Sequence, residues 1–313
     1  MNAFYQDVYN GLTAPFKQLS SKYFYDATGD SIFEEIMDCP EYYLTNCELE
    51  ILSQQSGAII DAILCHHSGW DVVELGPGNA KKSGFFLREM MQRGILFTYF
   101  PIDISENVIR QLEQTLPQHI PGVRVHPLPG EYLQMLGRVP QFSNRPRLVL
   151  FMGANIGNFS PGEARDFIRE LRKLLTPGDL LLIGFDLVKD PRIILAAYND
   201  RAGVTRRFNL NLLHRMNREL EANFEPARFE HFPTYDPQTG ACKSYLVSLA
   251  DQEVRLGEAD FIRFAKGEPI LTENSQKYSL AQIGAMAALN GFKVLKHFSD
   301  QQAWFTDSLW QCI

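Results

Sequence analysis

The stretch Asp71–Asn79, DVVELGPGN, decides the fold. A short strand, Asp71–Leu75, runs directly into Gly76-Pro77-Gly78, and a helix-like segment follows at Ser83–Gln92. Where a strand turns at glycines into a helix, the backbone approaches a ligand closely and the helix N-terminus carries partial positive charge. The stretch therefore predicts the first strand–turn–helix unit of a nucleotide-binding sheet, and the alternative is an ordinary tight turn.

Strands and helices alternate on the C-terminal side of this unit. Further strands are predicted at residues 97–103, 123–126, 147–152 and 179–185, and helices at 108–116 and 161–175. Ser160 caps the second of these helices. A helix at 280–289 and strands at 292–298 and 304–312 resemble the end of a seven-stranded methyltransferase-type sheet. The alternation predicts an α/β fold whose parallel sheet is covered on both faces.

Two regions do not follow this alternation. Residues 1–70 are predicted to be helical, with one helix capped by Asp30-Ser31 and ending before Pro40, and another over residues 45–65. Residues 187–277 combine a long helix at 206–222 with strand-like segments at 229–232, 243–249 and 253–256. We therefore expect one domain made of residues 51–186 and 278–313, and a second, inserted α+β domain made of residues 1–50 and 187–277.

Composition limits the classes of partner. The 313 residues include 30 Lys+Arg and 37 Asp+Glu, so the net charge is −7. This balance argues against nucleic acid as a partner, because a phosphate-backbone binder needs a basic face. Residues 1–20 do not resemble a signal peptide, and no apolar run is long enough to span a membrane. The scattered cysteines predict no disulfide framework or zinc knuckle: Cys39, Cys47, Cys65, Cys242 and Cys312. A cytoplasmic protein that acts on small molecules is expected.

The glycine turn favours S-adenosylmethionine (SAM) over a dinucleotide. A dinucleotide fingerprint needs a third small residue, but here the motif is Gly76-x-Gly78-x-x-Lys81. The acid before the glycines, Glu74, suits a cationic ligand better than a pyrophosphate. SAM carries a sulfonium and an ammonium group and has no phosphate. A nicotinamide-dependent dehydrogenase is the alternative.

Other polar residues complete the predicted cofactor site. Asp103 ends the next strand, where an acid can accept both ribose hydroxyls, although it could instead cap the following helix. Glu131 and Tyr132 follow the third strand, where an acceptor for an adenine amino group is expected beside an aromatic ring. Lys82 could reach the cofactor carboxylate or be a solvated helix residue.

From about residue 20 to its end, the chain resembles the SAM-dependent histidine Nα-methyltransferase family of ergothioneine biosynthesis. The matching stretches are Tyr23-Phe24-Tyr25-Asp26-x-x-Gly29, Phe33–Ile36, Pro40–Tyr43, Glu74-Leu75-Gly76-x-Gly78, Ile156–Asn158, Asp186–Asp190, Ala197-Tyr198-x-Asp200 and Thr272-Glu273-x-Ser275. The resemblance implies a Rossmann-like class I SAM methyltransferase sheet for the first domain and a substrate-binding role for the inserted α+β domain.

The resemblance also implies roles for single residues. Family enzymes hold a free α-amino acid, and here Asn158 and Tyr198 would bind its α-carboxylate. Tyr25 and the backbone around Gly153 would lie near its amine. The alternatives are a turn residue for Asn158 and a helix end for Tyr198.

The resemblance assigns the imidazole to Tyr42, Glu273 and Ser275. A ring with one N–H and one bare nitrogen needs an acceptor on one side and a donor on the other. Glu273 and Ser275 are two apart on an extended segment and so point the same way. The alternatives are a packing aromatic for Tyr42 and a surface acid for Glu273.

One position departs from the family pattern. Members that act on histidine place an apolar thioether residue against the imidazole, and here an ungapped match gives Ser244. A polar residue there would mean a different ring environment or a different amino acid, such as tryptophan or arginine.

The expected activity is SAM-dependent N-methylation of the α-amino group of a free amino acid. Histidine converted to Nα,Nα,Nα-trimethylhistidine (hercynine) is the leading reaction, with S-adenosylhomocysteine as the second product. Positioning can supply most of the rate, and an α-amino group titrates near pH 8 (~7.7–8.0), so no dedicated base and no metal are expected. Tyr25 and Asn158 are the candidate catalytic residues. We expect a monomer. The alternatives are another small metabolite as substrate and a non-catalytic SAM-binding protein.

Overall fold

The computed structural model describes residues 3–64 and 69–313. These divide into two compact units, and each is described by itself. Unit 1 consists of Met1–Tyr43 and Lys189–Lys277, and unit 2 consists of Leu44–Val188 and Tyr278–Ile313. The chain therefore passes between the units three times. The first two boundaries predicted from the sequence are 50/51 and 186/187, whereas the chain leaves one compact unit for the other at 43/44 and 188/189.

A seven-stranded sheet forms the centre of unit 2, in the order β11-β12-β5-β4-β1-β2-β3. Its strands are β1 (Gly69–Leu75), β2 (Leu96–Asp103), β3 (Leu128–Pro129), β4 (Arg147–Phe151), β5 (Leu180–Asp186), β11 (Phe292–Ser299) and β12 (Phe305–Cys312). β12 runs antiparallel to both of its neighbours, and the pairs β4–β5, β1–β4, β1–β2 and β2–β3 are parallel. This topology confirms the predicted methyltransferase-type sheet.

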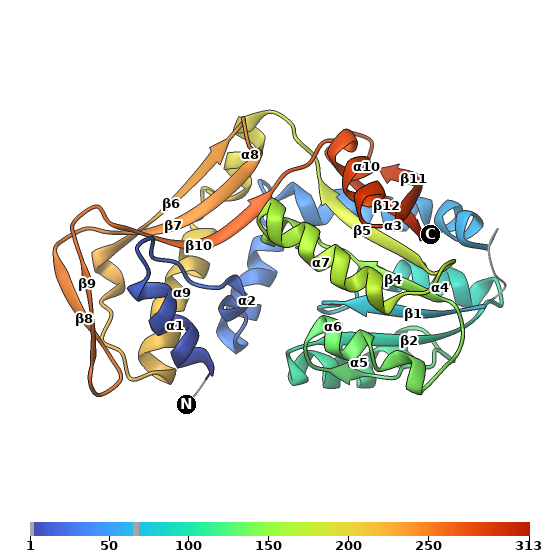
Figure 1. The fold of residues 1–313 in the computed structure, drawn as a ribbon, viewed down its shortest axis with the longest axis horizontal. Coiled ribbons are helices and arrows are strands. Elements are labelled where there is room, and N and C mark those ends of the chain that lie inside the picture. Colours follow the sequence, from blue (N-terminus) through green and yellow to red (C-terminus); the bar gives the residue numbers. More distant parts are fainter. Residues whose placement is uncertain (1–2, 65–68) are drawn as a thin grey trace. The chain divides into compact units, whose positions relative to one another are not determined.

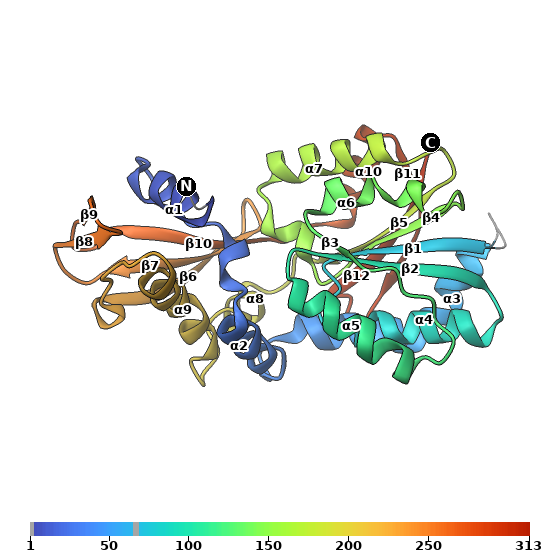
Figure 2. The ribbon, with the colours of Figure 1, turned by 90° about the horizontal axis from the view of Figure 1, so that it is seen from below.

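Helices cover both faces of this sheet. They are α3 (Tyr43–Leu64), α4 (Ser83–Gln92), α5 (Glu106–His119), α6 (Tyr132–Leu136), α7 (Pro161–Leu174) and α10 (Leu280–Leu289), with 3-10 turns η2 (Val139–Gln141) and η3 (Asn155–Asn158). Figure 2 shows α6, α7 and α10 on one face and α3, α4 and α5 on the other. Every residue of β4 and β5 is buried, because helices cover these apolar strands from both sides.

Two local predictions in unit 2 are resolved by the geometry. The strand predicted at residues 123–126 is wrong: only Val125 pairs with β2, as an isolated bridge, and β3 begins at Leu128. Pro127 lies between them and has no N–H for the ladder. Ser160 caps α7 as predicted, in a capping box with Glu163.

Unit 1 is built on a three-stranded antiparallel sheet, in the order β10-β7-β6, and a separate β8–β9 hairpin (Figure 1). Its elements are α1 (Ala3–Thr13), η1 (Ser21–Phe24), α2 (Ala27–Met37), α8 (Pro191–Ala197), α9 (Val204–Glu219), η4 (Pro226–Arg228), β6 (Phe229–Asp236), β7 (Ala241–Ser248), β8 (Gln252–Leu256), β9 (Asp260–Phe264) and β10 (Pro269–Gln276). The helix α9 packs on β6 and β7. This unit combines helices and strands, as expected for residues 187–277. The extended segment expected at Glu273 and Ser275 lies in β10, whereas β9 was not predicted.

The cap of α2 differs from the prediction. Asp26, rather than Asp30 or Ser31, is the N-cap, and its carboxylate accepts a hydrogen bond of 2.6 Å from the backbone N–H of Gly29. Asp26 also pairs with Arg218 of α9. The family-like stretch that begins at Tyr23 therefore contains the residues that start α2 and fasten it to α9.

A bulge in β10 sets the direction of its side chains. Ile270 lies opposite Leu246 of β7, but Glu273 lies opposite Ser244, so β10 uses one residue more than β7 between these pairs. Paired residues on neighbouring strands share a face of the sheet. Ile270 and Glu273 therefore face the same side although they are three residues apart, which an unbroken strand would not allow.

Other expectations concern cysteines and membrane spans. Cys39, Cys47, Cys242 and Cys312 are free thiols, and Cys65 lies outside the described residues, as does the end of the helix predicted over 45–65. Within residues 3–64 and 69–313, no helix is long and apolar enough to cross a membrane.

Candidate active site

The carboxyl ends of β1, β2 and β3 bring together four predicted cofactor residues, here called the strand-end cluster: Gly76, Asp103, Glu131 and Tyr132. Gly76 has φ +70°, and a Cβ at this position would lie 2.6 Å from Tyr132 Oη. Burial and the nearby charges of Asp103 and Glu131 raise the pKa of Tyr132 above its ordinary value. Ligands of open α/β sheets bind outside the carboxyl ends of the strands, where the strand order reverses, as it does between β1 and β4.

Asp103 is not the cap of the following helix. Ser105 is the N-cap of α5, and its side chain accepts a hydrogen bond from the Val108 N–H. The Asp103 carboxylate, which is half-buried, accepts the Ser105 N–H at 2.9 Å. Its pKa is raised by desolvation. Gly78, with φ +54°, has open space where a Cβ would be.

A buried acid that sequence reasoning missed organises the end of β4. Glu48 of α3 is fully buried, pairs with Lys82 and accepts the backbone N–H of Gly153 at 2.6 Å. It also faces Asp307 of β12, and burial together with the Glu48 charge raises the pKa of Asp307 well above its ordinary value. Lys82 is therefore not simply a solvated helix residue, since a buried carboxylate fixes its ammonium group. The one signal for Glu48 in the sequence is that this acid lies in a predicted helix whose other residues are largely apolar.

Glu74 joins β1 to β2. Its carboxylate is buried and accepts the Tyr99 hydroxyl at 2.5 Å. Desolvation raises the pKa of Glu74 to about 7, although the hydrogen bonds from Tyr99 and Ser83 oppose the rise. That Glu74 favours the binding of a cationic ligand stays a prediction.

A second set of predicted residues meets in unit 1, around the face of β10 that the bulge creates. We call it the polar cluster of unit 1, and its members are Tyr42, Tyr198, Ser244, Glu273, Ser275 and Lys277. The hydroxyls of Tyr198 and Ser275 lie 2.6 Å apart and are both buried. The ammonium of Lys277, which sequence reasoning did not select, donates to each of them at 2.8 Å. Tyr198 is also the C-cap of α8, so its backbone ends a helix while its hydroxyl joins the cluster.

Glu273 lies in the same cluster and is not a surface acid. The Ser244 hydroxyl donates to its carboxylate at 3.1 Å. Desolvation raises the pKa of Glu273, and the Ser244 hydrogen bond and the Lys277 charge oppose the rise. The ring of Tyr42 meets that of Tyr198 edge-on at 6.5 Å. Burial, followed by the charges of Tyr198 and Glu273, raises the pKa of Tyr42 well above its ordinary value.

Most of the residues predicted to bind the cofactor and the amino acid lie in these two clusters. A family model described as histidine-specific methyltransferase, SAM-dependent, matches residues 4–312. The chain belongs to this family. It is therefore a SAM-dependent methyltransferase, and the predicted family and fold class are confirmed.

Curated relatives agree with the family. The chain is 37% identical over 304 residues to a histidine N-alpha-methyltransferase of Mycolicibacterium smegmatis, covering 96% of this chain and 90% of the relative. It is 35% identical to a protein of the same name from Mycobacterium tuberculosis, covering 97% and 93%. It is also 30% identical to ergothioneine biosynthesis protein 1 of Schizosaccharomyces pombe, covering 90% of this chain and 37% of that protein.

The remaining predicted residues of the family lie elsewhere in the units. Tyr25 of unit 1 is partly exposed, and its ring meets Phe33 and Phe208 edge-on at 5.7 and 6.0 Å. Its charge also contributes to the raised pKa of Tyr42. Asn158 of unit 2 is exposed and ends η3, two residues before the cap of α7. Gly153 has φ +74° and precedes η3.

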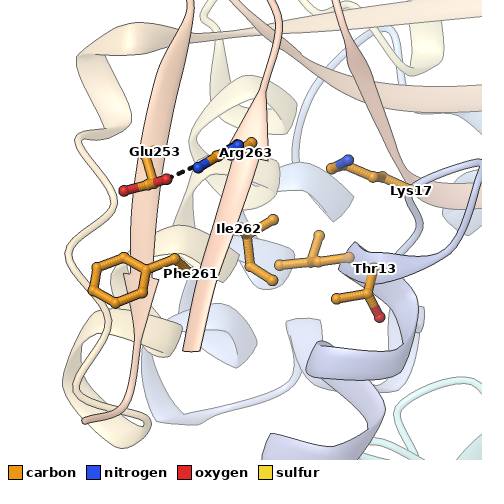
Figure 3. Close-up of a pocket in the computed structure, with 7 residues that line it drawn as sticks. Thr13, Lys17, Glu253, Phe261, Ile262 and Arg263 are labelled. Carbon is orange, nitrogen blue, oxygen red and sulfur yellow. Dashed lines mark hydrogen bonds and ion pairs between the residues drawn. The ribbon is translucent and has the colours of Figure 1, made fainter. Parts of the chain in front are cut away.

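A separate groove in unit 1 contains none of these residues. It has a volume of about 380 Å³ and lies between the end of α1 and the β8–β9 hairpin (Figure 3). Its charged side chains already have partners: Arg263 pairs with Glu253, and Lys17 pairs with Glu268. In the part of the chain that the structure describes, no group of three or more His, Cys, Asp or Glu side chains could hold a metal ion.

Proposed function

We propose that this enzyme transfers methyl groups from SAM to the α-amino group of L-histidine and produces Nα,Nα,Nα-trimethylhistidine. The observation that carries the proposal is the polar cluster of unit 1, where an acid, two linked hydroxyls and a buried cation surround one face of β10. The cluster has a hydrogen-bond acceptor at Glu273 and a hydrogen-bond donor at Lys277. A free amino acid with a basic ring has the same two requirements, a donor for its carboxylate and an acceptor for its ring N–H.

The carboxylate is proposed to bind the Tyr198 hydroxyl. Lys277 donates a hydrogen bond to this hydroxyl at 2.8 Å, and the Ser275 hydroxyl lies 2.6 Å from it. Hydrogen bonds in which one partner is ionised are shorter and stronger than neutral ones, so a carboxylate is the preferred acceptor here. Asn158, as a second carboxylate ligand, and Tyr25 and Gly153, near the amine, enter the proposal from the family resemblance alone.

The imidazole is proposed to bind Glu273, with Ser275 on the same face and Tyr42 as a donor to the second ring nitrogen. Glu273 is fixed by Ser244, so its carboxylate is already oriented before a ligand binds. Ser244 stands where family members that act on histidine place a thioether. A thioether would pack against the imidazole ring. We infer that Ser244 instead donates a hydrogen bond to Glu273, the acid proposed to bind the ring N–H.

The strand-end cluster is proposed to hold the adenosine part of SAM. Asp103 would accept the ribose hydroxyls, and Glu131 and Tyr132 would flank the adenine, while Lys82 would face the carboxylate of the methionine part. The missing Cβ at Gly76 supports this fit, because a side chain there would meet Tyr132 Oη. SAM supplies a methyl group on a positively charged sulfur, which becomes neutral on transfer.

The chain's own task in the reaction is to orient an unprotonated amine. A free α-amino group titrates at about pH 8, and a neighbouring positive charge lowers this pKa further by like-charge repulsion. The protein therefore needs no buried base, and positioning by the polar cluster supplies the effect. Tyr25 is proposed to orient the amine. Three successive transfers require open space around the nitrogen.

Calorimetric titration of the S-adenosylhomocysteine-loaded protein tests the proposal. L-Histidine is titrated into wild type and Glu273→Ala, with L-tryptophan and L-arginine as competing ligands. We expect histidine to bind wild type more tightly than the other amino acids, and Glu273→Ala to weaken histidine at least about tenfold. Equal binding of histidine to both proteins would show that the ring assignment is wrong. Tighter binding of another amino acid than of histidine would identify that amino acid as the substrate instead.

Mass spectrometry of the product decides the number of methyl groups. Incubation with SAM and histidine is expected to give a gain of three methyl groups on the α-nitrogen. The alternatives are distinguishable here, since a non-catalytic SAM-binding protein gives no methylated product from any amino acid.

A further inference from the structure

Lys277 is a buried cation to which the proposed function assigns no contact with the substrate. Its side chain is fully buried, at 0% exposure, directly after β10. Burying an ammonium group is costly unless hydrogen bonds replace its water. Two of its hydrogen bonds are to neutral hydroxyls, those of Tyr198 and Ser275. It also lies over the ring of Tyr198, 4.6 Å from the centroid.

Lys277 follows the polar side chains of Glu273 and Ser275 along the chain. Glu273 and Ser275 lie on one face of β10, opposite Ser244 and Cys242 of β7, and the ammonium of Lys277, which follows the strand, reaches the Ser275 hydroxyl. The Lys277 charge is close enough to Glu273 to oppose the rise in the pKa of that acid, and the ammonium donates to the Ser275 hydroxyl at 2.8 Å. An amino acid bound along this row meets positive charge at one end and negative charge at the other.

The ammonium of Lys277 acts directly on both hydroxyls. An ammonium has donors only, so the oxygens of Tyr198 and Ser275 both accept from Lys277, at 2.8 Å each. The two oxygens lie 2.6 Å apart, so the three groups form one hydrogen-bonded network. The positive charge polarises both O–H groups, and a polarised hydroxyl is a stronger donor to an anionic acceptor.

We propose that Lys277 is a positioning residue whose charge, acting through the Tyr198 hydroxyl, makes the enzyme select ligands that carry a carboxylate. This inference rests on the proposed amino-acid substrate. Lys277 contacts Tyr198 and Ser275 and does not itself touch the ligand. Amines that have the same ring but no carboxylate are excluded by the loss of this interaction.

The test compares L-histidine with L-histidinol, which replaces the carboxylate by a hydroxymethyl group. Both are titrated into the S-adenosylhomocysteine-loaded wild type, Lys277→Met and Lys277→Gln. Methionine keeps the length of the side chain without charge, and glutamine keeps donors without charge. Lys17→Met is the matched control, because Lys17 is an ion-paired lysine of the same unit outside the cluster.

We expect the preference for histidine over histidinol to fall at least about tenfold in both Lys277 variants and to stay unchanged in Lys17→Met. In a Tyr198→Phe background, Lys277→Met should change the preference by less than about twofold, since residues that act as one unit are not additive. Thermal unfolding shows that each variant is folded, and if methionine prevents folding the glutamine variant decides.

Three results separate the possible failures. A folded Lys277→Gln that keeps the full preference for histidine overturns this inference and leaves the proposed function intact. A wild type that binds neither ligand overturns the proposed function itself. Equal losses of histidine and histidinol in the variants show that Lys277 only supports the local structure, which also overturns the inference.

Discussion

At the scale of single residues, the Ser244–Glu273 pair is where the resemblance predicts a departure of this chain from its family. A serine hydroxyl reaches the acid at 3.1 Å, and it opposes the rise in pKa that burial imposes on Glu273. The serine therefore helps to keep the acid ionised in a partly desolvated position. A thioether at the same place would pack against a ring but could not donate this hydrogen bond.

Replacing Ser244 by alanine is expected to shift the pH dependence of histidine binding. Without the hydroxyl, the pKa of Glu273 rises further, so the affinity for histidine at low pH should be lost at a higher pH than in wild type. The titration of free histidine is common to both proteins, so the difference reports on Glu273. Calorimetry between pH 5 and 8 measures it. Ser248→Ala is the control, since Ser248 is a buried serine of β7 that bonds Ala250; superimposable profiles for Ser244→Ala and wild type would contradict this role.

Gly76→Ala is expected to abolish binding of S-adenosylhomocysteine. The new Cβ would lie 2.6 Å from Tyr132 Oη, on a backbone with φ +70° that favours glycine. Because the clash is with the end of a side chain, Tyr132→Phe in the same protein should restore part of the affinity. Fluorescence or calorimetric titration of the two variants measures this. No recovery in the double variant would mean that backbone strain, and not the hydroxyl, limits binding.

At the scale of elements, the bulge in β10 decides which residues form the polar cluster. Thr272 lies at this irregularity, and its hydroxyl is within hydrogen-bond distance of Asn209 Oδ1, at 2.6 Å, and of the Ser244 carbonyl, at 3.0 Å. It thereby joins β10 to both α9 and β7. The bulge turns Glu273 to the face that Ile270 already occupies, which no regular alternation in the sequence indicates.

Thr272→Val is expected to destabilise the protein by about 1–3 kcal/mol, because it leaves the buried Asn209 oxygen without this donor. Histidine affinity should fall as well, since Glu273 is the next residue. Thr234→Val, on β6 of the same sheet, should change stability by no more than about 0.5 kcal/mol. Urea unfolding and calorimetry measure the two effects. Full stability of Thr272→Val would show that the bulge does not depend on this side chain.

The sequence predicted the elements of unit 2 better than those of unit 1. Apolar strands such as Leu180–Asp186 and the glycine turn after Leu75 are strong local signals, and they predicted the sheet correctly. In unit 1, β10 contains polar residues at Thr272–Gln276, so its strand character comes from pairing with β7 rather than from its own pattern. Buried polar residues such as Glu48 and Lys277 were missed for the same reason, since charged residues are expected on the surface.

At the scale of the whole molecule, stability should depend on pH through buried acids. Glu74 has a pKa of about 7 in the folded protein, compared with 4.5 when it is exposed. The folded state thus binds the proton more tightly, so the free energy of unfolding falls as pH rises from 4.5 through 7. At 1.36 kcal/mol per pKa unit, the loss is about 3 kcal/mol.

Glu74→Gln should remove this dependence, because glutamine does not titrate and can still accept the Tyr99 hydroxyl. Relative to wild type, the variant is expected to gain about 3 kcal/mol of stability between pH 4.5 and 8. Urea unfolding at a series of pH values measures the difference. Parallel curves for the two proteins would mean that Glu74 is ionised in the fold.

The position of β12 constrains how the protein can be made. It follows all other strands of its sheet in the chain, yet it lies inside the sheet, between β5 and β11. During synthesis, β5 therefore keeps an unpaired backbone edge until residues 305–312 have left the ribosome. Such an edge is a template for pairing with other chains. Slow translation between β5 and β12 would therefore prolong the time in which β5 can pair with another chain.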